Sequence, residues 1–142
     1  MTLRQSTAVA IGGRALLIEG PAGSGKSSLA LALVDRGATL IGDDGISLSM
    51  RTGTLWALPA PATAGLIEIR NVGIVSLPTT EAPVALMLDL REDAPRFVER
   101  AESLVIAGQA VPVLAFDPRV PATAVRAEHA LALHGLGPVR TA

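Results

Sequence analysis

The chain has 142 residues, of which 49% are apolar, 18% charged and 2% aromatic, with a net charge of -1 and no cysteine. These values predict one folded domain over residues 1–142 and exclude disulfides, thiolate metal sites and a cysteine nucleophile. Near-neutral charge, scarce aromatic side chains and the lack of a long apolar run argue against nucleic-acid and membrane partners, so we expect a cytoplasmic protein.

Short apolar runs separated by glycines predict the elements of the first half. Gly12 and Gly13 separate residues 7–11 from residues 15–19, a pattern typical of an antiparallel hairpin. Residues 26–36 carry leucines and alanines at helical spacing, and Gly37 ends that helix. Further extended segments are predicted at residues 38–42, 46–50, 54–58, 66–69 and 73–77.

The second half begins with the most apolar strand candidate, residues 83–90. Residues 94–107 are predicted to be helical, with Pro95 near the start and Gly108 as the stop. A strand at residues 111–116 and a last helix at residues 121–134 follow. Alternating strands and helices with inserted hairpins predict an α/β fold, a mixed β-sheet with flanking helices.

The segment GPAGSGKS fits the spacing of a phosphate-binding loop between a strand and a helix. Its glycines let backbone N–H groups curl around phosphate oxygens, and the following helix directs its positive end at the same anion. A lysine in this position reaches the β and γ phosphates, and the adjacent serine hydroxyl ligates Mg²⁺. The predicted nucleotide contacts are Gly20, Pro21, Ala22, Gly23, Ser24, Gly25, Lys26, Ser27 and Ser28.

A nucleotide site also needs acidic side chains, and two places offer them at the ends of apolar strands. Asp43 and Asp44 follow residues 38–42, a strand that we expect beside the strand preceding the loop, with its carboxyl end facing the phosphates. There, one carboxylate could hold metal through water while the other takes a proton from a hydroxyl group. Asp89 resembles an ordinary Walker B aspartate, although a solvent contact at a strand end is the slightly favoured interpretation.

The segment GLIEIRNVGIV places Glu68 and Arg70 on one side of a short strand and Ile67 and Ile69 on the other. Together with GPAGSGKS and LVDRGATLIGDD, it resembles the catalytic domain of HPr kinase/phosphorylase in its short alphaproteobacterial form. This resemblance runs from about residue 7 to residue 75. It implies a P-loop fold related to phosphoenolpyruvate carboxykinase, and an ATP-dependent kinase that phosphorylates the carrier protein HPr on serine.

The resemblance also implies roles for individual residues and for cofactors. With ATP and Mg²⁺ as cofactors, Lys26 would stabilise the transferring phosphates, and Ser27 and Glu68 would hold the metal. Asp44 would be the base that deprotonates the acceptor serine. Members of the family form homohexamers.

Two more residues complete the implied catalytic set. Asp43 would support the metal or the base, and Arg70 would position phosphates or its own strand. Gln5 stands where the family usually has a histidine, and Asn71 stands where its signature has a glycine. Residues 111–121 contain no clear counterpart of the family's PGRN-like loop, and Arg119 is not assigned its role.

Two other readings stay open at this point. One is a small-molecule kinase or nucleotide hydrolase in which Asp89 acts as the Walker B residue. The other is a regulatory module that binds ATP and signals to a partner without turnover. The departures from the family pattern leave the reverse, phosphorylase reaction open as well.

Overall fold

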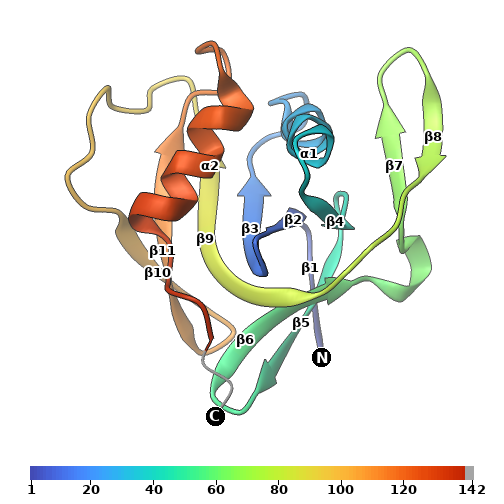
Figure 1. Ribbon diagram of the computed structural model, residues 1–142, viewed down its shortest axis with the longest axis horizontal. Helices are drawn as coiled ribbons and strands as arrows, with labels where there is room; N and C mark the ends of the chain where they lie inside the picture. Colours follow the sequence, from blue (N-terminus) through green and yellow to red (C-terminus); the bar gives the residue numbers. More distant parts are fainter. Residues whose placement is uncertain (140–142) are drawn as a thin grey trace.

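The computed structural model describes residues 1–139 (Figure 1). Strands hold more of the described residues than helices do, and a long curved strand, β9, runs through the middle of the molecule. The helical elements are α1 (Lys26–Asp35), the 3₁₀ turn η1 (Pro61–Thr63) and α2 (Thr123–His134). The strands are β1 (Thr2–Arg4), β2 (Thr7–Ile11), β3 (Arg14–Glu19), β4 (Thr39–Gly42), β5 (Ile46–Arg51), β6 (Thr54–Pro59), β7 (Leu66–Ile69), β8 (Gly73–Ser76), β9 (Ala82–Leu90), β10 (Glu102–Ile106) and β11 (Gln109–Phe116).

The main sheet is mixed and brings several strand ends to one edge. β9 runs parallel to β3 and to β11, whereas β2 lies antiparallel between β3 and β4. Two antiparallel pairings around β2 leave β4 parallel to β3. The carboxyl ends of β4, β3, β9 and β11 therefore meet at the same edge, which is where open α/β sheets bind ligands.

Two apolar cores cover the two faces of this sheet. Leu16 and Ile18 of β3 pack in one cluster with Leu33 of α1 and Leu131 of α2, and Figure 1 shows both helices on that side. Leu17 packs in the other cluster with residues of β5 and β6. Because successive side chains of a strand point to opposite faces, both the odd and the even positions of β3 are buried.

The hairpins predicted from glycine positions are confirmed. β2 pairs with β3, and β5 pairs with β6, each as antiparallel neighbours. Gly12 and Gly13 have φ values of 56° and 81°, and Thr52 and Gly53 have values of 52° and 78°. Two consecutive positive φ angles are the geometry of the tight turn that suits the twist of a hairpin.

The predicted helix at residues 94–107 is wrong. Residues 91–101 are irregular, and β10 pairs antiparallel with β11 through a turn at Ala107 and Gly108, whose φ values are 49° and 88°. Gly108 is therefore a hairpin glycine rather than a helix stop. The helical spacing of apolar residues did not reflect a buried face, since Phe97 is 77% exposed and Val105 is 70% exposed.

The predicted neighbour of β3 is also wrong, because β2 and not β4 lies beside it. The carboxyl end of β4 nevertheless lies at the sheet edge of the glycine loop, as predicted. β4 is parallel to β3 and is separated from it by β2. A separate two-stranded sheet, β7 and β8, stands next to α1 (Figure 1). Within residues 1–139, no helix is long and apolar enough to cross a membrane.

Candidate functional site

The loop from Gly20 to Gly25 joins β3 to α1, and its backbone requires glycine at several positions. Gly23 and Gly25 have φ values of 79° and 102°, which side chains strongly disfavour. At Gly20 the restriction is close packing, because a Cβ would lie 2.8 Å from the Ser24 hydroxyl and 3.0 Å from the Leu90 Cβ. The glycine spacing of the sequence motif thus has a geometric cause at each of these positions.

The start of α1 is left open to an anion. Within the described chain, Gly25 caps the helix without a side-chain hydrogen bond, and the first turn carries no acidic residue. The ammonium group of Lys26 donates to the Gly20 carbonyl at 2.9 Å and so lies folded over the loop. The Ser24 hydroxyl is buried without a partner in residues 1–139. The backbone N–H groups of the first turn, which no side chain caps, and the helix dipole suit a phosphate group.

The turn after β4 brings both predicted aspartates to the loop. Asp43 Oδ1 accepts a hydrogen bond from the Ser27 hydroxyl at 2.7 Å and another from the Thr7 hydroxyl at 3.2 Å. Asp44 has a φ of 59°, and its backbone N–H donates to Thr7 Oγ1 at 3.1 Å. Gln5 Nε2 lies 3.5 Å from Asp44 Oδ1, so it faces the aspartate that is the candidate base.

The β7–β8 hairpin supplies the remaining predicted residues. Ile67 is fully buried in the apolar cluster that contains the α1 leucines, whereas Glu68 and Arg70 are exposed. The alternation predicted for this strand is therefore confirmed. Asn71 has a φ of 67°, a left-handed conformation that glycine adopts freely and asparagine tolerates better than most residues. Asn71 is therefore compatible with the turn between β7 and β8.

A cleft of about 750 Å³ opens between these three segments. It includes the predicted glycine loop, both aspartates of the β4 turn, and both charged residues of the β7–β8 hairpin, while Ser24 of the loop does not line it. The lining residues are Gln5, Thr7, Glu19, Gly20, Pro21, Ala22, Gly23, Gly25, Lys26, Ser27, Ser28, Asp43, Asp44, Glu68, Arg70 and Asn71.

Asp89, the alternative Walker B residue, lies at the end of β9, in register with Glu19 of β3. It does not line the cleft but borders a second hollow, on the side of β11, and lies 3.8 Å from Arg91. The slightly favoured reading of Asp89 as a strand-end contact therefore agrees with its position.

Sequence reasoning missed two cleft residues, Thr7 and Glu19. Glu19 forms a two-pronged ion pair with Arg4, with N–O distances of 2.6 and 3.0 Å. The hydrogen bonds that the Arg4 guanidinium donates to this carboxylate raise the pKa of Arg4. Neither residue belongs to a spacing pattern. Glu19 is indicated only by its ion pair with Arg4 of β1, and Thr7 only by its hydrogen bonds to the aspartate turn.

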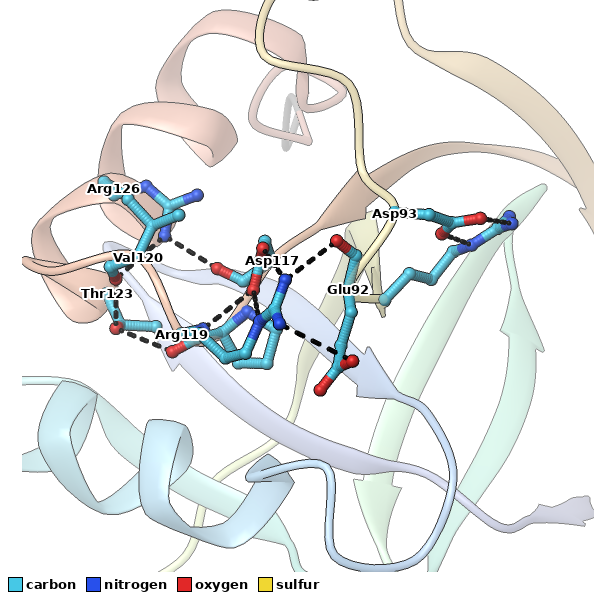
Figure 2. A network of polar contacts seen from close by, with 9 residues as sticks. Glu92, Asp93, Asp117, Arg119, Val120, Thr123 and Arg126 are labelled. Carbon is cyan, nitrogen blue, oxygen red and sulfur yellow. Dashed lines mark hydrogen bonds and ion pairs between the residues drawn. The ribbon is translucent and has the colours of Figure 1, made fainter.

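A second polar network flanks the loop (Figure 2). Arg119 donates to both carboxylate oxygens of Asp117, at 3.1 and 2.9 Å, and to the Glu92 carbonyl at 3.1 Å. This pairing lowers the pKa of Asp117 to about 2. Pro118 lies between Asp117 and Arg119 in the chain and is close to the loop. A Cβ added to Gly25 would lie 3.9 Å from the Cβ of Pro118. Arg119 is thus held by acidic neighbours and does not line the cleft.

The oxygen atoms of the cleft fit Mg²⁺ better than a softer metal. Ser27, Asp43 and Glu68 offer only hydroxyl and carboxylate oxygens, the ligands that Mg²⁺ takes. The described residues contain no group of three or more His, Cys, Asp or Glu side chains that could hold an ion alone. That is the usual arrangement for Mg²⁺, which binds one or two carboxylates together with substrate phosphates and water.

Comparisons with known proteins place the chain beside one family. Residues 2–80 match the family model of the HPr Serine kinase C-terminal domain. The HPr kinase/phosphorylase of Streptococcus thermophilus is 46% identical over 70 residues, which are 49% of this chain and 23% of that protein. The Streptococcus pneumoniae protein of the same name is 34% identical over 114 residues, covering 70% of this chain and 37% of its own length.

A solved structure extends the likeness beyond the matched half. The HPr(Ser) kinase/phosphatase from Coxiella burnetii superposes with a TM-score of 0.78 at 28% identity, over 94% of this chain and 93% of that one. The chain thus spans about a quarter to just over a third of the curated streptococcal relatives but nearly all of the solved chain.

Proposed function

Because the chain belongs to the HPr Serine kinase C-terminal domain family, we propose that it is an ATP-dependent protein-serine kinase acting on an HPr-type carrier protein. The observation that carries this proposal is the convergence of three segments on one cleft. The glycine loop, the Asp43-Asp44 turn and the hairpin residues Glu68 and Arg70 are separate in sequence but line the same space.

The glycine loop and Lys26 bind the nucleotide phosphates. Backbone N–H groups at the start of α1 donate to phosphate oxygens, because no side chain of the described residues caps this helix. Lys26 exchanges its bond to the Gly20 carbonyl for the β and γ phosphates. The fit of the loop to a phosphate rests on its positive-φ glycines, whose conformation leaves the backbone approachable.

Ser27, Asp43 and Glu68 would hold Mg²⁺, and the ion would supply positive charge against the phosphates. Ser27 and Asp43 are already in contact at 2.7 Å, so they present their oxygens to the same region. Glu68 faces them from the β7 side of the cleft. Arg70, in the turn that follows β7, adds a positive charge that would position the transferring phosphate.

Asp44 is the base that removes the proton from the acceptor hydroxyl. It is exposed at the cleft, as a group that must meet a second protein has to be. It lies next to Asp43 in the turn, so the base and a metal ligand are fixed relative to each other by one stretch of backbone. A positioned base contributes about 10²–10⁴-fold to the rate of such a step.

The test is transfer of the γ phosphate from labelled Mg²⁺-ATP to HPr, beside HPr whose acceptor serine is replaced by alanine. Asp44→Asn is expected to lower transfer by at least about 100-fold while ATP still binds. Asp89→Asn is the matched control, an aspartate at the same sheet edge but outside the cleft, and should transfer normally.

Transfer at the normal rate by Asp44→Asn would contradict the assignment of the base. Bound ATP without label on HPr would contradict the kinase proposal and favour a nucleotide-sensing module. Loss of phosphate transfer to HPr in Asp89→Asn as well would support the alternative hypothesis, in which Asp89 is the Walker B residue.

A further inference from the structure

Thr7 occupies an unusual position for a hydroxyl group. It is fully buried at the first position of β2, opposite Ile18 of β3. β2 lies between the strand that leads into the glycine loop and the strand that leads into the aspartate turn. Thr7 therefore lies on the strand between these two parts of the cleft, and its hydroxyl contacts both residues of the aspartate turn.

The direction of its hydrogen bonds follows from the donors available. The Asp44 backbone N–H can only donate, so Thr7 Oγ1 accepts from it at 3.1 Å. The single hydroxyl proton of Thr7 is then directed to Asp43 Oδ1 at 3.2 Å. The chain of bonds runs from the backbone of one aspartate, through Thr7, to the carboxylate of the other.

Both hydroxyl donors at Asp43 meet the same oxygen. Ser27 donates to Oδ1 at 2.7 Å, as Thr7 does at 3.2 Å, and Oδ2 receives no hydrogen bond from residues 1–139 in the structure. Two donors on one oxygen fix the carboxylate plane and leave the other oxygen available for a cation. Such partners orient metal ligands in proteins, and their loss costs about 10–100-fold in metal affinity or activity.

We propose that Thr7 is a positioning residue for the divalent cation and the base, holding the Asp43 carboxylate and the Asp44 backbone in one arrangement. The inference rests on the proposed function only in assigning a cation to Asp43 and base catalysis to Asp44. Thr7 does not touch the reacting atoms and acts through the two aspartates. The positive φ of Asp44, 59°, is kept in place by the bond that its N–H donates to Thr7.

The test compares Thr7→Val, which keeps the shape and removes the hydroxyl, with Thr7→Ser, which keeps the hydroxyl. Thr39→Val is the matched control, the same change at the far end of β4, where Thr39 lies opposite Ala10. The first readout is Mn²⁺ binding in the presence of a non-hydrolysable ATP analogue. The second readout is hydrogen exchange of the Asp44 amide in the protein alone.

With Thr7→Val, Mn²⁺ affinity is expected to fall about 10–100-fold, and the Asp44 amide to exchange about tenfold faster. Thr7→Ser should restore both readouts, and Thr39→Val should change neither. Wild-type Mn²⁺ affinity in Thr7→Val would overturn the proposal. Equal losses in Thr7→Val and Thr7→Ser would overturn it as well, because they would show that any change at this buried position lowers the affinity, whether or not the hydroxyl is kept.

Two further comparisons allow the test to be interpreted if the variant does not fold or if the protein is not a kinase. If Thr7→Val does not fold, the wild-type protein decides, because an Asp44 amide that exchanges at the rate of an unprotected amide would overturn the proposed hydrogen bond. Neither readout involves an acceptor protein. A chain that binds Mn²⁺ and the analogue as expected but labels no HPr therefore refutes the kinase and leaves the role of Thr7 supported.

Discussion

Ile67→Ala tests whether the β7–β8 hairpin is held in place by its inner face. Ile67 is fully buried and belongs to the same apolar cluster as Leu29 and Leu33 of α1. β7 and β8 form a sheet of their own, and a two-stranded hairpin is marginal without packing against another element. The position of Glu68, the next residue, therefore depends on this contact.

The expected cost follows from the atoms removed. Isoleucine loses roughly three carbon atoms, each worth about 0.8 kcal/mol when fully buried. The cavity left by incomplete collapse adds to this, so the free energy of unfolding should fall by about 3–4 kcal/mol. Ile74→Ala is the matched control, because Ile74 lies opposite Glu68 in the same hairpin and is 72% exposed. Its cost should stay below about 0.5 kcal/mol.

Two assays separate stability from the site. Denaturant unfolding can be followed through Trp56, the only tryptophan of the chain, which lies on β6 away from the hairpin. Binding of a Mg²⁺–nucleotide analogue at low temperature, where both variants are folded, reports on Glu68. We expect Ile67→Ala to lose affinity while Ile74→Ala keeps it.

A shift of less than about 1 kcal/mol in the Trp56 transition would refute the packing argument. It would mean that the hairpin is not part of the main apolar cluster. Equal nucleotide affinity in the two variants would refute the second step, in which the inner face positions Glu68.

Two other predictions concern the glycine loop and its flank. Gly25→Ala should lower the free energy of unfolding by about 1–3 kcal/mol and weaken nucleotide binding, because the φ of 102° disfavours a Cβ. Gly137→Ala is the control, since Gly137 has no positive φ and its Cβ would meet open space. It should change neither the stability nor the binding. The Arg119 pairing lowers the pKa of Asp117 to about 2, so its stabilisation is complete above ~4, the pKa of an unfolded aspartate, and is lost as the pH falls towards 2. The difference in unfolding free energy between wild type and Asp117→Asn should therefore shrink over that range in urea titrations, and a constant difference would contradict the assignment.

Local signals in the sequence predicted most of the elements. Paired turn residues such as Gly12 and Gly13 have only a few compatible conformations, so the hairpin around them follows from sequence alone. The strand at residues 83–90 was equally clear, because a continuous apolar run of that length indicates a strand buried on both faces. Helix and hairpin could not be separated at residues 94–107, where the apolar spacing fitted a helix although the residues are exposed.

Long-range placement limited the prediction of the site. The loop and the Asp43-Asp44 pair could be identified because their spacing is local, and the structure brings both to one cleft, although their roles remain predictions. The position of β2 between β3 and β4 depends on pairings across the sheet that no periodicity encodes. Thr7 was missed for that reason, because the contacts of a single hydroxyl group depend on which strands lie on either side of it.

The open first turn of α1 has a consequence for how this protein responds to its surroundings. In the described residues that turn has neither a capping side chain nor an acidic residue, so an anion supplies the compensation that other helices carry in their own sequence. Stability and ligand concentration are then linked by mass action. A ligand at 100 times its dissociation constant adds about 2.7 kcal/mol to the folded state. For the nucleotide proposed above, a melting curve recorded over a concentration series is therefore expected to be a binding curve as well.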